Sequence, residues 1–102
     1  MAKALNLENA FDAALEEVKR AQDKGMTTLA GASAKSELEQ LAGELRAERV
    51  RAVGRGRVDR AWFEKTLKWV VSWVPESDLQ VIAALGRIVR AQGHPSPREG
   101  AG

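Results

Sequence analysis

The arginines in the middle of the chain are the residues whose type and spacing could do chemistry. Six of them fall within fifteen positions, from Arg46 to Arg60, and only Glu48 and Asp59 bring negative charge among them. A guanidinium group makes paired hydrogen bonds to phosphate or carboxylate oxygens, and the two glycines of this segment let a backbone approach an anion closely. The segment therefore predicts an anion or nucleic-acid site. Its candidate residues are Arg49, Arg51, Arg55, Arg57 and Arg60.

The same segment has a simpler interpretation as a solvated, charged connection between helices. Residues 1–48 hold six basic and nine acidic side chains, whereas residues 49–98 hold ten basic and four acidic ones. The arginines could therefore pair with acids of the first half and serve stability alone. Neither a phosphate-binding loop nor a dinucleotide fingerprint accompanies them, and no segment reads as the polar recognition helix of a helix-turn-helix. Whether the arginines are already paired with acids distinguishes the two interpretations.

The tryptophans form the second candidate site, because all three lie within residues 60–74. On a helix, Trp62, Trp69 and Trp73 fall within about 40° of one another, and we call them the Trp stripe. Aliphatic side chains and Phe63 occupy an adjoining arc. An apolar arc this wide fits a central helix with neighbours on two sides. The alternative is that the Trp stripe binds a protein partner, since Trp is enriched at interaction hot spots.

Other catalytic chemistry has little support. The chain has no cysteine, which excludes disulfides, thiolate metal sites and thiol catalysis. His94 is the only histidine, and a single imidazole outside the predicted fold gives neither a zinc site nor a general base. Carboxylate pairs such as Glu16 and Glu17 fall on the polar sides of helices. We therefore expect a protein that is not an enzyme and that needs no metal or cofactor.

The elements that must position these residues are helices. Four segments show apolar residues at the 3.6-residue period, and they predict an all-α domain over residues 1–93, a small bundle of about four helices. The segments are 6–24, 35–53, 60–74 and 77–93. Residues 94–102 contain two prolines and two glycines and predict a disordered tail. We expect the last two segments to provide most of the core, whose residues are Leu7, Phe11, Leu15, Val18, Leu38, Leu41, Leu45, Phe63, Leu67, Val70, Val74, Ile82, Leu85 and Val89.

Capping residues mark the ends of these helices. Asn6 and Asp59 are suited to cap helix N-termini, and Gly25 stands where a left-handed residue ends the first helix. Two further pairs fit capping boxes, Ser36 with Glu39 and Ser77 with Gln80. These signals favour helix throughout.

Residues 50–74 also admit a strand interpretation. Leu67, Trp69, Val71 and Trp73 alternate with their neighbours, and such residues favour strands. The glycines at 54 and 56 could then form the turn of a short hairpin. In this alternative the fold is α+β, with the hairpin around residues 50–74.

The remaining signals concern location and function. The longest apolar run, residues 69–74, is far shorter than the roughly 20 residues of a membrane span, and no secretion signal is recognisable at residues 1–6. We expect a cytoplasmic protein without a membrane partner. The leading hypothesis is a non-enzymatic protein interaction module, either a homo-oligomer or an adaptor, that uses the Trp stripe. The alternative is a small DNA- or RNA-binding protein that uses residues 46–60.

Overall fold

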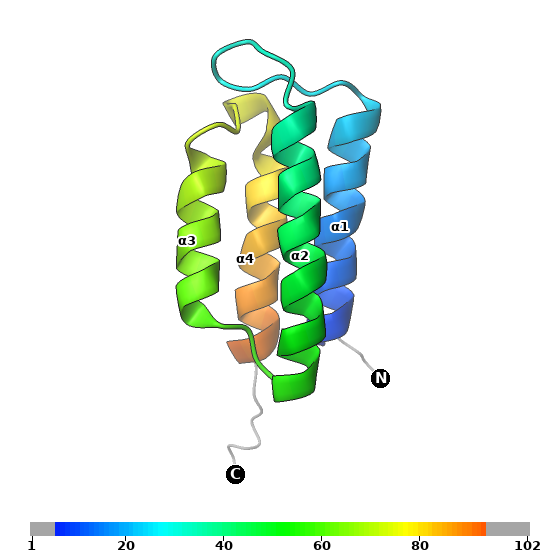
Figure 1. Cartoon of the computed structure of the whole chain (residues 1–102), viewed down its shortest axis with the longest axis vertical. Helices are drawn as coiled ribbons and strands as arrows, with labels where there is room; N and C mark the ends of the chain where they lie inside the picture. The colour runs from blue at the N-terminus through cyan, green and yellow to red at the C-terminus, as the bar shows by residue number, and fades with distance from the viewer. Residues whose placement is uncertain (1–5, 94–102) are drawn as a thin grey trace.

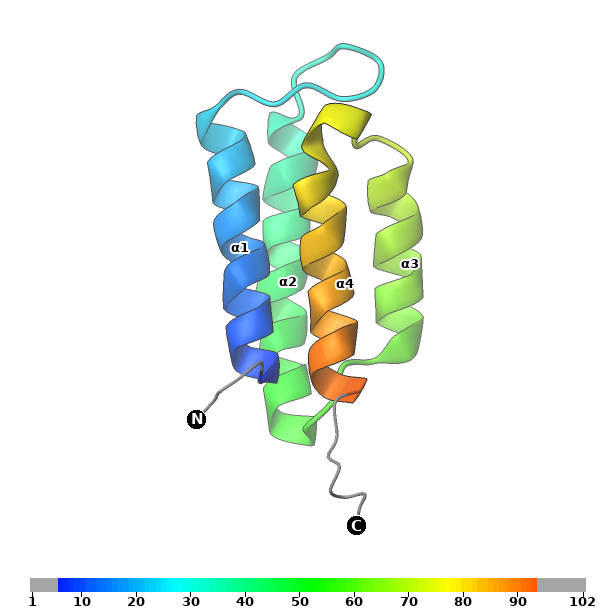
Figure 2. The ribbon, with the colours of Figure 1, turned by 180° about the vertical axis from the view of Figure 1, so that it is seen from behind.

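The computed structural model describes residues 6–93, and these form an antiparallel bundle of four α-helices (Figure 1, Figure 2). The elements are α1 (Leu7–Asp23), α2 (Lys35–Arg55), α3 (Arg60–Val71), the 3-10 turn η1 (Glu76–Asp78) and α4 (Leu79–Gly93). The predicted all-α bundle is confirmed. Within residues 6–93 the only β pairing is an isolated bridge between Thr27 and Ser33, so the hairpin alternative is wrong. The predicted tail, residues 94–102, lies outside the described residues.

Three of the predicted helix signals are confirmed. The Asn6 side chain accepts a hydrogen bond from the Asn9 N–H (2.8 Å), and the Asp59 carboxylate accepts one from the Ala61 N–H (3.0 Å). These bonds satisfy N–H groups that the first turn of a helix leaves without partners. Gly25 follows α1 with φ +73°, a left-handed conformation that ends the helix. The sequence thus marks the start of α1 and α3 and the end of α1 correctly.

Both predicted capping boxes are wrong. Helix α2 begins at Lys35, before Ser36, and the Ser33 hydroxyl accepts from the Lys35 N–H (3.2 Å). Ser77 lies inside η1, so α4 begins only at Leu79. Ser33 has no Glu or Gln three positions later, so the capping-box pattern does not identify the serine that bonds near the start of α2.

Helix α2 ends later at the two glycines near residue 55 than the sequence predicts. Helix α2 continues through Gly54 to Arg55, and Gly56 then turns with φ +85° while its N–H bonds the Ala52 carbonyl (2.7 Å). Helix α3 ends at Val71 instead of Val74. Only the second glycine therefore interrupts a helix.

The core is centred on α1, which packs against both α2 and α4. Ala21 of α1 lines a small hollow together with Val81 of α4, and the buried Ala10 and Ala14 fall on the same face of α1 as Ala21. Helix α4 contributes the buried Ala84 and Ala91. Small side chains at a helix contact let two backbones approach closely. The larger core residues fill the middle of the bundle: Phe11, Leu38, Leu41, Leu45, Leu85 and Ile88 are fully buried.

Helix α3 is the edge of the bundle, not its centre. It packs mainly against α4, and only Thr66 and Val70 are buried along its length. The expectation that α3 and α4 provide most of the core is therefore wrong. Several predicted core residues are correspondingly only half-buried: Leu7, Leu15, Phe63, Leu67, Ile82 and Val89.

Candidate functional site

The Trp stripe lies mostly inside the bundle. Trp62 reaches from α3 to α2, where its indole N–H donates to a carboxylate oxygen of Glu44 (3.0 Å). Its ring centre lies 6.2 Å from that of Phe11 on α1. Trp69 and Trp73 contact each other edge to face, with ring centres 5.2 Å apart. Trp73 is buried, whereas Trp62 and Trp69 are half-buried, so the three indoles fill the space between α3 and its neighbours and form no exposed wall.

Trp73 has an unusual environment. Its Nε1 is the only buried side-chain nitrogen or oxygen in the described part of the chain that lacks a hydrogen-bond partner. Such an unpaired donor costs about 1–3 kcal/mol. The backbone carbonyl of Trp73 is satisfied, because it accepts from the Leu29 N–H (3.0 Å) in the loop between α1 and α2. The Trp73 ring therefore stabilises the fold through packing, whereas its N–H makes no stabilising hydrogen bond.

Arg49 is engaged by acids of the first half of the chain. Its Nε donates to Asp12 and its Nη2 to Glu8, each at 2.9 Å. The hydrogen bond to Asp12, together with the charges of both carboxylates, raises the pKa of Arg49 above its ordinary value. This pairing joins α1 to α2, as the connector interpretation expects.

Glu48 is the centre of the remaining arginine network, and the sequence reasoning missed this role. Its carboxylate is 1% exposed and receives Arg51 Nε (3.1 Å) and Arg55 Nη2 (2.7 Å). It also accepts the backbone N–H of Asp59 (2.9 Å), which ties the end of α2 to the start of α3. A signal was present, since Glu48 falls three residues after Leu45 and four before Ala52, on the buried face of α2.

The two other candidate arginines, Arg57 and Arg60, are less engaged by acids of the chain. Arg60 pairs with Glu64 at 3.3 Å, and both side chains are largely exposed. The Arg57 side chain makes no ion pair or hydrogen bond within residues 6–93. The structure brings three of the five predicted arginines to one surface hollow of about 560 Å³, which we call the arginine hollow. Its lining residues are Arg55, Arg57, Val58, Asp59 and Arg60.

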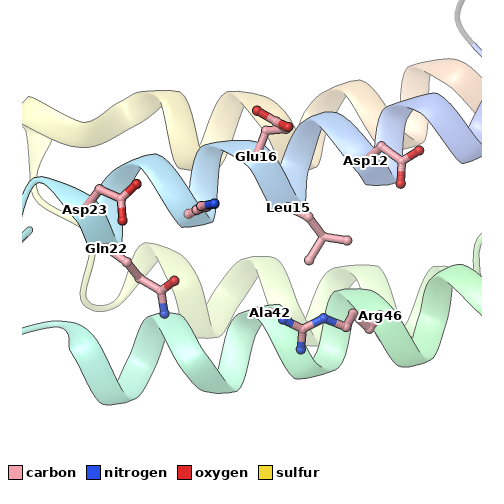
Figure 3. A pocket seen from close by; sticks show the side chains of 8 residues that line it. Asp12, Leu15, Glu16, Gln22, Asp23, Ala42 and Arg46 are labelled. Atoms are coloured by element: carbon pink, nitrogen blue, oxygen red, sulfur yellow. The ribbon is translucent and has the colours of Figure 1, made fainter.

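A second hollow, of about 640 Å³, lies between α1 and α2. In Figure 3, Leu15 points from α1 toward α2, and the Arg46 guanidinium lies below it. The carboxylates that line this hollow come from α1 alone, and Lys19 lies among them. Within the described residues no group of His, Cys, Asp or Glu side chains could hold a metal ion. This hollow therefore offers a mixed-charge surface.

A strip of half-exposed apolar residues runs along the contact between α3 and α4. Phe63, Leu67 and Val71 follow one another at four-residue spacing on the flank of α3 opposite Trp62. Because Trp62 faces α2, that flank faces α4.

The matching flank of α4 is identified in the same way. Val81 of α4 lines a small hollow together with Ala21 of α1, so this flank of α4 faces α1. Residues on the opposite flank therefore lie toward α3. They are Leu79, Ile82 and Val89.

We call these six residues the α3–α4 strip. Its upper end is the most open, since Val71 is 50% and Leu79 is 53% exposed. Phe63, Leu67, Ile82 and Val89 are half-buried along the rest of it.

The strip has positively charged surroundings. Helices α3 and α4 carry five cations that are exposed or half-exposed: Arg60, Lys65, Lys68, Arg87 and Arg90. The acids on these helices and on η1 are fewer. Glu64 pairs with Arg60, Asp78 is buried and pairs with Lys24 of α1, and Glu76 is exposed.

Comparisons with protein-family models, with curated proteins and with solved structures find no match to this chain. Among residues 6–93, no helix combines the length and apolar character needed to cross a membrane.

Proposed function

We propose that this protein is a non-enzymatic interaction module whose α3–α4 strip receives an amphipathic helix from another protein. The observation that supports the proposal is the strip itself, which leaves six apolar side chains partly in water along one helix contact. Contiguous exposed apolar surface is uncommon on monomeric proteins and is typical of interaction sites. The function class is the one expected from the sequence, but the surface differs, because the Trp stripe lies on the inner flank of α3.

The arrangement of the strip in two rows favours a helix as its occupant. Two rows of apolar side chains on neighbouring helices accept the apolar face of a third helix, which inserts side chains at positions i, i+3 or i+4, and i+7. Helix α3 has 12 residues, which corresponds to a length of about 18 Å. A partner helix of three to four turns would cover the strip from Phe63 to Val71.

The charge around the strip favours an acidic partner. Lys68 and Arg90 flank the strip on its two helices, and both side chains are exposed. The nearest acid on α3, Glu64, is already paired with Arg60. Complementary charge around an apolar contact increases the association rate and selects against basic partners. The partner helix should therefore carry Asp or Glu beside its apolar face.

The nucleic-acid alternative has less support. Arg49, Arg51 and Arg55 are bound to Glu8, Asp12 and Glu48. A nucleic-acid backbone needs cations that follow its phosphates along a track. The described arginines leave no such continuous track.

The proposal can be tested with synthetic helices and two exposed positions. The probe is a labelled amphipathic peptide of about 16 residues with leucines on one face and glutamates beside them, followed by fluorescence polarisation at two salt concentrations. Val71→Glu and Leu79→Glu place a carboxylate in the exposed upper end of the strip, where the fold should tolerate it. We expect each variant to weaken binding by at least about tenfold. Val50→Glu is the matched control, because Val50 is exposed on α2, away from the strip.

Three results would contradict the proposal. One is equal binding of a peptide with lysines in place of the glutamates, and another is an equal loss in the Val50→Glu control. The third is a dimer of the full chain, detected by sedimentation, that Val71→Glu dissociates. That result would show that the strip binds a second copy of the chain instead of another protein.

A further inference from the structure

The arginine hollow lies at the opposite end of α3 from the exposed part of the strip, where the chain turns from α2 into α3. Gly56 makes the turn with φ +85°, and no atom lies within 4 Å of where a side chain on it would begin. Helix α3 starts at Arg60 and turns its positive end toward the same region. Three of the residues that line the hollow are arginines, namely Arg55, Arg57 and Arg60.

Glu48 holds one of these groups in place. It binds Arg55 through Nη2 at 2.7 Å, and Arg55 is 37% exposed. A guanidinium has five N–H donors, so this single contact leaves Arg55 able to bind a further acceptor. Glu48 also binds Arg51, so one buried carboxylate serves two cations, and positive charge remains in excess around it.

The other two arginines are available without loss of any buried contact. Arg57 has no side-chain partner in the described part of the chain. Arg60 is 86% exposed and its contact with Glu64 is long, at 3.3 Å. Pairs of this kind contribute little to stability. The one opposing charge in the lining is Asp59, whose carboxylate is occupied as the cap of α3 by the Ala61 N–H.

We infer that the arginine hollow binds a single phosphate group carried by a small molecule. A phosphate monoester presents three oxygens and close to two negative charges, which suits Arg57 and Arg60 together with the spare donors of Arg55. A carboxylate would use only part of this donor set. A polyanion is disfavoured because Arg49, further back along α2, is bound by Glu8 and Asp12 of α1, outside the hollow.

The test is a titration of the full chain with inorganic phosphate, at ionic strength held constant with sodium chloride, followed by NMR of the backbone amides. We expect saturable shifts confined to residues 55–61. Arg57→Gln should weaken binding at least about fivefold, a difference of about 1 kcal/mol. Arg46→Gln is the matched control, because Arg46 is an exposed arginine of α2 outside the hollow, and it should leave the affinity unchanged.

Shifts that spread over all cationic residues, or an affinity that Arg57→Gln does not change, would overturn the inference. A second titration uses a short single-stranded oligonucleotide. If it binds more tightly than inorganic phosphate and its shifts reach Lys65, Lys68 and Arg90, the ligand is a nucleic acid and the single-phosphate site is wrong. Because Arg57 is no part of the α3–α4 strip, failure of this inference leaves the proposed interaction module untouched.

Discussion

Replacing Glu48 is the change that tests the structure most directly, because this carboxylate is fully buried in the core. Its contacts join two parts of the chain, the end of α2 through Arg51 and Arg55 and the start of α3 through the backbone N–H of Asp59. Glu48→Ala removes all of them and leaves a void. Glu48→Gln keeps the shape and an acceptor but removes the charge.

The expected cost can be worked out contact by contact. In Glu48→Ala the Asp59 N–H loses its acceptor, which costs about 1–3 kcal/mol. The ion pairs add little to this cost, because Arg51 and Arg55 are 54% and 37% exposed and water can solvate both after the carboxylate is gone. With the void included, we expect a loss of about 2–4 kcal/mol. Glu48→Gln should lose about 1–2 kcal/mol, since it replaces a charged hydrogen bond with a neutral one.

The assay is urea unfolding followed by circular dichroism, together with a thermal melt. A loss of 1 kcal/mol lowers the melting temperature by about 4–8 °C in a domain of this size. Glu64→Ala is the control, because Glu64 is 68% exposed and its pair with Arg60 should be worth under about 1 kcal/mol. If the free energy of unfolding of Glu48→Ala lies within about 0.5 kcal/mol of that of the original protein, the assignment of Glu48 as the residue that joins α2 to α3 is refuted.

Two further predictions concern the packing of the bundle. Trp73→Phe removes the unpaired buried N–H together with part of the ring, so the free energy of unfolding should change by under about 1 kcal/mol. Trp73→Ala should cost about 3–5 kcal/mol. Equal losses of the two variants in urea unfolding would show that the indole N–H has a partner. Ala84→Leu should overpack the close contact between α1 and α4 and cost about 1–3 kcal/mol. The control is Ala83→Leu on the exposed side of the same helix, which should cost under about 0.5 kcal/mol. Equal melting temperatures of the two variants would contradict the close contact.

Periodicity and capping chemistry made most of the helical architecture predictable. The apolar spacing identified four helices, and Asn6, Asp59 and Gly25 marked three helix ends at the residues where the structure has them. These features are local, since a cap bonds an N–H two or three residues away. The strand alternative failed for a related reason, because alternation over a few bulky residues fits either period when the segment is short.

The candidate sites were less predictable, because they depend on which helix faces lie together. The sequence placed Arg49, Arg51 and Arg55 among the candidate ligands of an anion, yet Glu8, Asp12 and Glu48 bind them. Asp12 lies 37 positions away from Arg49, a separation over which sequence gives no pairing information. The sequence identified the Trp stripe, but it did not indicate which neighbouring helices the tryptophans contact.

The sequence by itself determined the class of fold and the residue types available for chemistry, because helix period, caps and the absence of cysteine are properties of short stretches or of composition. Tertiary structure alone decided the rest. It put α1 at the centre of the core and α3 at the edge, where only Thr66 and Val70 are buried. Contacts between residues far apart in the chain, such as Trp62 with Glu44, turned the Trp stripe inward and left the α3–α4 strip and the arginine hollow at the surface.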